Sequence, residues 1–122
     1  VQYSLPIKIF ILNNEYMGMV RQWQELLHDK NYSESYTAAL PDFVKLAEAY
    51  GCLGIRAQTP EELDDKIIEM INTDRPVIFD CRVDKQENCF PMIPSGKPHN
   101  QMLLGPKDQK ENKITGKGKT LV

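Results

Sequence analysis

The alternation of strand-like and helix-like segments constrains the fold of this 122-residue chain most strongly. Apolar runs rich in β-branched residues predict strands over residues 7–12, 53–57 and 77–83. Apolar residues at helical spacing predict amphipathic helices over residues 16–28, 41–51 and 59–73. The order strand, helix, helix, strand, helix, strand predicts an α/β fold, a parallel sheet covered by helices.

Local signals set the expected ends of these elements. We expect Ile7–Leu12 to be a buried strand that Asn13 and Asn14 end with turn chemistry. Pro41 suits the first turn of the second helix. Thr59 is the expected cap of the third helix, with Glu62 reaching back to close a capping box.

Charge and cysteine usage exclude several classes of protein. Lys and Arg number 15 and Asp and Glu 17, a formal net charge of −2, which argues against a nucleic-acid-binding protein. An apolar run of the roughly 18 residues that a membrane helix needs is absent from the sequence. Cys52, Cys81 and Cys89 have no CxxC spacing, which argues against a disulfide framework or structural zinc and favours a reducing cytoplasm.

The composition divides the chain into a domain and a tail. Residues 1–104 read as one domain, whereas residues 105–122 hold five lysines among polar residues and glycines and read as a mobile tail. The lysines are Lys107, Lys110, Lys113, Lys117 and Lys119. Because a strand follows only six residues after Val1, we expect the chain to be a piece of something longer.

The two asparagines are the first candidates for chemistry. In an open α/β sheet, ligands bind at the carboxyl ends of the strands, where Asn13 and Asn14 are expected. An amide oxygen suits Mg²⁺, and the start of the following helix suits a phosphate. Asparagines that merely cap a helix are commoner, so this signal by itself is weak.

A longer motif carries a resemblance to a known family. The segment Leu12–Gln24, with its Gly-Met-Val-x-Gln-Trp pattern, closely resembles the thiamine-diphosphate-binding domain of the acetohydroxyacid synthase (acetolactate synthase) catalytic subunits. The likeness continues through Leu40–Ala49 and Gly54–Arg56 and ends at the Pro-Met-x-Pro-x-Gly pattern of Pro91–Gly96. It covers residues 1 to 104, and both patterns are specific to this family among thiamine-diphosphate enzymes.

The resemblance implies a role for each matching residue. Asn14 would supply a side-chain oxygen and Tyr16 its backbone carbonyl to Mg²⁺. Gly18, Met19 and Val20 would line thiamine diphosphate, with Gly18 allowing a close approach of the backbone.

The same resemblance implies a substrate pocket further along the chain. Trp23 would shape the pocket for the second 2-ketoacid, and Ser95 belongs to a segment that folds over the same channel. Structural alternatives stay open: Trp23 and Met19 as core residues, and Ser95 as a turn residue. Asp80 and Arg82 are interpreted as a surface pair in a strand.

The resemblance also implies parts that these 122 residues do not carry. The aspartate of a Gly-Asp-Gly motif, the glutamate that activates the cofactor and an FAD-binding domain would belong to a longer parent protein, in which two subunits form the site. No catalytic residue is assigned within the chain, and we expect the chain alone to be inactive. The implied parent is a homodimer in the cytoplasm, or in a plastid in a plant, with a possible regulatory subunit.

Three functions remain as hypotheses. The first is an acetolactate synthase that joins two 2-ketoacids with loss of CO2, in branched-chain amino-acid biosynthesis. The second is a non-catalytic α/β binding module. The third is another thiamine-diphosphate-dependent 2-ketoacid decarboxylase, which the Gln22–Trp23 context disfavours.

Overall fold

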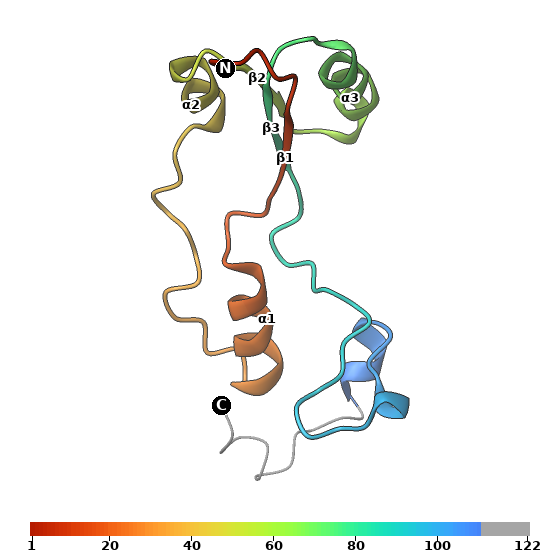
Figure 1. Ribbon diagram of the computed structural model, residues 1–122. Coiled ribbons are helices and arrows are strands. Elements are labelled where there is room, and N and C mark those ends of the chain that lie inside the picture. The colour runs from red at the N-terminus through yellow and green to blue at the C-terminus, as the bar shows by residue number, and fades with distance from the viewer. Residues whose placement is uncertain (111–122) are drawn as a thin grey trace. The chain divides into compact units, whose positions relative to one another are not determined.

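The computed structural model describes residues 1–110, which form two compact units (Figure 1). The first unit comprises residues 1–15 and 38–85, and the second comprises residues 16–37 and the chain from residue 86 onward. Residues 111–122, which make up most of the predicted tail, lie outside the described residues. Residues 105–110 of that tail include a short 3-10 helix, Pro106–Lys110.

A parallel sheet forms the centre of the first unit, as the sequence predicts. Its strands are β1 (Lys8–Asn13), β2 (Leu53–Ala57) and β3 (Val77–Arg82), in the order β1-β3-β2. Lys8 and Leu53 both lie opposite Val77, so the three strands are in step and end together at one edge.

Helices cover both faces of this sheet. In Figure 1, α2 (Phe43–Ala49) and α3 (Leu63–Asn72) lie on either side of it. Helix α2 packs so closely that a Cβ added to Gly54 would lie 2.7 Å from the Val44 carbonyl oxygen. Glycine at this position therefore lets the helix backbone approach β2.

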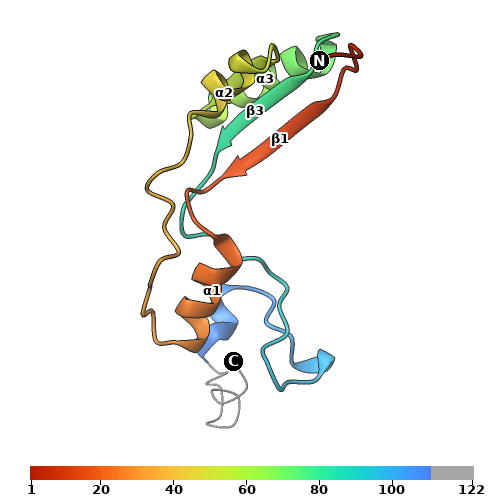
Figure 2. The same cartoon turned by 60° about the vertical axis from the view of Figure 1, so that its left-hand side comes forward.

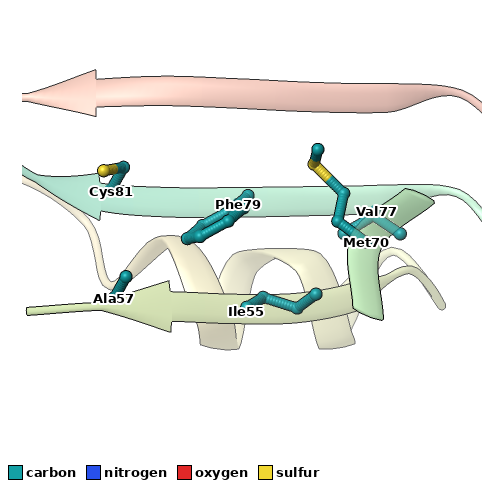
Figure 3. Packing of buried hydrophobic residues seen from close by; sticks show 6 residues of the cluster. All are labelled: Ile55, Ala57, Met70, Val77, Phe79 and Cys81. Carbon is teal, nitrogen blue, oxygen red and sulfur yellow. The ribbon is translucent and has the colours of Figure 1, made fainter. Parts of the chain in front are cut away.

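The hydrophobic core lies between the sheet and α3. Alternate residues of β2 and β3 point to the same face, and their side chains form the cluster of Figure 3 with Met70 of α3. The cluster consists of Ile55, Ala57, Met70, Val77, Phe79 and Cys81. Leu63 and Ile67 pack against it. From their spacing we expect Leu63, Ile67, Met70 and Ile71 to form the buried face of this helix; the structure confirms this for the first three, whereas Ile71 is 63% exposed.

The expectation that β1 is buried is wrong. Asn13 is its one buried residue, and Leu12 is 69% exposed. Within residues 1–110 this strand has a neighbour on one side, β3. An edge strand loses the cover that a central strand receives, which explains why an apolar run here is exposed.

The helix starts also differ from the predictions. Helix α2 is capped by Asp42, whose side chain accepts from the backbone N–H groups of Val44 and Lys45, and Pro41 precedes this cap. The Glu62 carboxylate accepts from the N–H of Gln58, and the backbone N–H groups of Gln58 and, more weakly, Thr59 lower its pKa. The Thr59 side chain makes no capping bond in the described structure. The carboxylates of Asp42 and Glu62 each accept from backbone N–H groups near the start of a helix, which is what helix capping requires.

The second unit contains one α-helix and a looped segment. Helix α1 (Gly18–Leu27) is labelled in Figure 2. Residues 86–110 form turns and short 3-10 helices, of which one is His99–Gln101. Met92 and Leu103 exchange two backbone hydrogen bonds of 2.9 and 2.7 Å, which close a loop over the residues between them.

Candidate functional site

A buried carboxylate organises the edge at which the three strands of the first unit end. Asp80 of β3 is fully buried and accepts from Asn13 Nδ2 (2.8 Å) and Arg56 Nε (2.8 Å). Arg82 Nε lies 3.4 Å from the same carboxylate. Asp80 and Arg82 do pair, as predicted, but the predicted surface location is wrong, because Asp80 is fully buried and joins residues of all three strands.

Contacts of Asn13 and Glu15 hold the turn after β1 on both sides of Asn14. Asn13 Oδ1 accepts from the Glu15 N–H (3.1 Å), and Glu15 adopts a left-handed φ of 60°. The Glu15 carboxylate pairs with Arg82 Nη1 (2.9 Å) and Lys85 Nζ (2.5 Å). These contacts stabilise a conformation that non-glycine residues rarely adopt, and they fix the backbone around the half-buried Asn14.

The same network extends to α2. Arg56 Nη2 donates to Asp42 Oδ1 (2.7 Å), the carboxylate that caps α2. The Arg56 guanidinium holds the pKa of Asp42 below its usual value, and the hydrogen bond to Asp80 raises the pKa of Arg56. Both groups are therefore charged at neutral pH, and they tie the helix start to the edge of the sheet.

Asn13 does not cap helix α1. Asn13 bonds to Asp80 and Glu15 instead, both within the first unit. Helix α1 begins after Met17, which within residues 1–110 makes no side-chain capping bond. The carboxamide of Asn13 thus shapes the turn that carries Asn14.

In the second unit, α1 has an unusual distribution of side chains. Met19, Val20 and Trp23 lie on one face of the helix, and all three are exposed, Trp23 by 46%. Arg21 and Gln22 lie toward the other side and are buried. The structural alternative of Trp23 and Met19 as core residues is therefore wrong, whereas Leu27 of the same helix is buried.

Tyr16 and Ser95 lie in well-defined turns of the second unit. Tyr16 forms an antiparallel bridge with Tyr36, and their ring centroids are 5.1 Å apart. Ser95 is exposed in a turn closed by the Lys97 N–H and the Pro94 carbonyl (3.0 Å), with Gly96 at a φ of +76°. Ser95 is therefore a turn residue whose side chain is accessible.

The donor atoms at these positions suit Mg²⁺. The Asn14 amide oxygen and the Tyr16 carbonyl oxygen are neutral, hard donors of the kind this ion prefers. Glu15 is already paired with two cations, so its carboxylate is neutralised by the protein itself. No group of three or more His, Cys, Asp or Glu side chains that could hold a metal occurs among residues 1–110.

Comparison with known proteins decides the family. Residues 1–81 match the family described as thiamine pyrophosphate enzyme, C-terminal TPP binding domain. The chain belongs to this family. Helices long and apolar enough to cross a membrane are not found in residues 1–110.

Several acetolactate synthases are similar in sequence. The acetolactate synthase large subunit of Cyanidium caldarium is 52% identical over 103 residues, which are 84% of this chain and 18% of that protein. The acetolactate synthase isozyme 3 large subunit of Escherichia coli is 43% identical over 107 residues, 85% of this chain and 19% of that protein. The chain thus spans about a fifth of the length of these relatives.

A solved structure supports the α/β fold. The thiamine diphosphate-dependent 4-hydroxybenzoylformate decarboxylase of Rhodococcus jostii RHA1 superposes with a TM-score of 0.63 and 30% sequence identity. The match covers 71% of this chain and 16% of that one. The parallel sheet with its helices is therefore the fold of a thiamine-diphosphate-binding domain.

Proposed function

We propose that this chain is the C-terminal part of an acetolactate synthase catalytic subunit. The reaction condenses two 2-ketoacids with loss of CO2, such as two pyruvates to 2-acetolactate, in branched-chain amino-acid biosynthesis. The observation that carries this proposal is the 52% identity to an acetolactate synthase large subunit over 84% of the chain.

The turn after β1 and the start of α1 are the proposed cofactor site. Asn14 would hold Mg²⁺ through its side-chain oxygen and Tyr16 through its backbone carbonyl, while Gly18, Met19 and Val20 would line thiamine diphosphate. The anchored backbone on both sides of Asn14 supports this assignment, because a metal ligand needs a fixed position. When bound, thiamine diphosphate supplies the carbanion chemistry at the carbonyl carbon of a 2-ketoacid.

Trp23 and Ser95 are the proposed substrate residues. Trp23 presents an exposed indole on the same face as Met19 and Val20, an apolar surface suited to the side chain of a 2-ketoacid and to excluding water. Ser95 offers an accessible hydroxyl that can donate to a carboxylate. These residues bind and orient substrate, and the proposal gives none of them a proton-transfer step.

The whole protein would carry more than this chain. We propose that it is a homodimer with bound FAD and a regulatory subunit, located in the cytoplasm or, in a plant, in a plastid. Mg²⁺ requires six ligands, and the chain offers two of the proposed set. The isolated chain is therefore expected to form no acetolactate.

Product analysis separates this function from the decarboxylase that the structural similarity also favours. The intact protein is supplied with pyruvate, Mg²⁺, thiamine diphosphate and FAD. Acetolactate as the main product supports a synthase, whereas acetaldehyde without acetolactate would identify a simple decarboxylase. Absence of both products would contradict the synthase and a pyruvate decarboxylase and favour the binding module.

Calorimetric titration of thiamine diphosphate with Mg²⁺ tests the site. Binding to the intact protein should weaken at least about tenfold in Asn14→Ala, because a metal ligand is lost. Asn100→Ala, an exposed asparagine of the second unit, is the matched control and should bind like the wild type. Equal binding by Asn14→Ala and Asn100→Ala would overturn the role of Asn14.

A further inference from the structure

Helix α1 reverses the usual arrangement of a surface helix. Gln22 is 1% exposed and Arg21 is fully buried, whereas the neighbouring Trp23 is 46% exposed. A helix ordinarily buries its apolar side and exposes its polar side. Buried polar groups cost free energy unless they are hydrogen-bonded, so the partners of Arg21 and Gln22 decide what this buried side does.

The side-chain oxygen and nitrogen of Gln22 both form hydrogen bonds with the backbone of Cys89. The Cys89 N–H donates to Gln22 Oε1 (2.6 Å), and Gln22 Nε2 donates to the Cys89 carbonyl (3.2 Å). Gln22 Nε2 also lies 2.8 Å from Met92 Sδ. The side chain thus satisfies the donor and the acceptor of Cys89 as a neighbouring strand would, which a carboxylate, a thioether or a shorter amide in its place could not do.

Arg21 holds the two residues before Cys89. Its Nη2 donates to the Glu87 carbonyl (2.8 Å) and to Asn88 Oδ1 (2.7 Å), and its Nη1 pairs with Glu25 of the same helix. Three consecutive residues, 87–89, are therefore fastened to α1. We call Arg21, Gln22 and residues 87–89 the clamp.

Residues 87–89 of the clamp come just before the loop that carries Ser95. Three residues beyond Cys89, Met92 pairs with Leu103 and closes the loop. Inside it, the Pro94–Lys97 turn exposes Ser95. Since Gln22 and Trp23 are adjacent on one rigid helix, the clamp sets where this loop lies with respect to the exposed indole.

We propose that Gln22 is a positioning residue for the second 2-ketoacid: its carboxamide anchors the loop of Ser95 to the helix that carries Trp23. The proposal rests on the proposed acetolactate synthase function. The residue touches neither substrate nor cofactor in this role, and it acts through the loop. Its removal should weaken substrate binding more than it slows turnover.

Gln22→Met removes both hydrogen bonds at nearly constant side-chain volume. Gln24→Met is the matched control, because Gln24 lies on the same helix and donates to a different segment, at the Ser33 carbonyl (2.7 Å). Asn88→Ala is a milder second variant that removes one acceptor of Arg21 from a half-buried position and leaves the helix intact. All three are compared in the intact protein with thiamine diphosphate, Mg²⁺ and FAD present.

Two measurements test the proposal. Amide hydrogen exchange over residues 86–92 should quicken in Gln22→Met and in Asn88→Ala, and should stay as in the wild type in Gln24→Met. The KM for the 2-ketoacid should rise about tenfold in Gln22→Met, the kinetic equivalent of one or two lost hydrogen bonds, with kcat and thiamine diphosphate affinity nearly unchanged.

The outcomes distinguish this inference from the proposed function. Unchanged exchange in both clamp variants would overturn the anchoring. So would a fall in kcat at constant KM, or equal kinetic effects in Gln22→Met and Gln24→Met, since either indicates a general structural role. If Gln22→Met does not fold, Asn88→Ala decides by the same criteria. An intact wild type that forms no acetolactate would contradict the proposed function, and the exchange comparison would still decide the anchoring.

Discussion

At the scale of single residues, Asp80 holds together the polar side chains at the edge where the three strands end. It is a fully buried carboxylate that accepts from Asn13 and from Arg56 and lies beside Arg82. Such a group stabilises the fold because each of its partners is present, and removing it would leave the Asn13 amide and the Nε groups of Arg56 and Arg82 without this acceptor. The turn at Asn14 depends on the same carboxylate through Asn13.

Asp80→Ala should lower the free energy of unfolding by about 3 kcal/mol, since it breaks a buried charge network. Urea unfolding followed by circular dichroism measures the change. Asp74→Ala is the control, because Asp74 is exposed in the turn before β3, and its effect should stay within about 0.5 kcal/mol. A loss below 1 kcal/mol in Asp80→Ala would show that the sheet edge does not depend on this carboxylate.

At the scale of elements, the sequence predicts which segments are strands or helices more reliably than it predicts whether those elements are buried. Residues 53–57 and 77–82 are strands as expected, because β-branched runs between turn signals are a local property. The apolar run of β1 and the apolar face of α1 have the pattern of buried elements and are exposed. Periodicity indicates that an apolar face exists, and neighbours elsewhere in the chain decide whether it meets core or solvent.

The contacts of the clamp and of Asp80 also depend on residues that are far apart in the sequence. Gln22 and Cys89 are 67 residues apart in sequence, as are Asn13 and Asp80. Neither pairing leaves a local pattern, so the sequence by itself predicts neither the burial of Asp80 nor a structural role for Gln22. The sequence does offer one signal: Asp80 is a carboxylate between two apolar residues of a strand, Phe79 and Cys81, and such a residue is either exposed or fully partnered.

Gly54 tests the packing of α2 on β2. In Gly54→Ala the new Cβ would lie 2.7 Å from the Val44 carbonyl oxygen and 2.8 Å from Val44 Cα, so the helix must move. The free energy of unfolding should fall by about 1–3 kcal/mol, as for other overpacked sites. Gly105→Ala is the control, because its Cβ would meet no atom within 4 Å, and differential scanning calorimetry should find it unchanged. A neutral Gly54→Ala would mean that α2 moves away from the sheet at little cost.

At the scale of the whole molecule, much of the apolar surface of β1 is exposed among residues 1–110. Ile9, Phe10 and Leu12 are all exposed on an edge strand, which is an arrangement that promotes strand pairing between chains. The chain spans about a fifth of the length of its acetolactate synthase relatives, so this surface is a candidate contact for parts of the protein outside these residues.

The isolated chain should therefore self-associate as its concentration rises. A charge on the edge opposes pairing, so Ile9→Lys should shift the chain toward monomer in sedimentation velocity experiments. Leu104→Lys is the control, because Leu104 is 72% exposed and belongs to the second unit, away from the strand edge in sequence. A wild type that sediments as a monomer at every concentration would contradict the prediction. Equal effects of the two lysines would attribute association to net charge, because only pairing through β1 makes the position of the new charge matter.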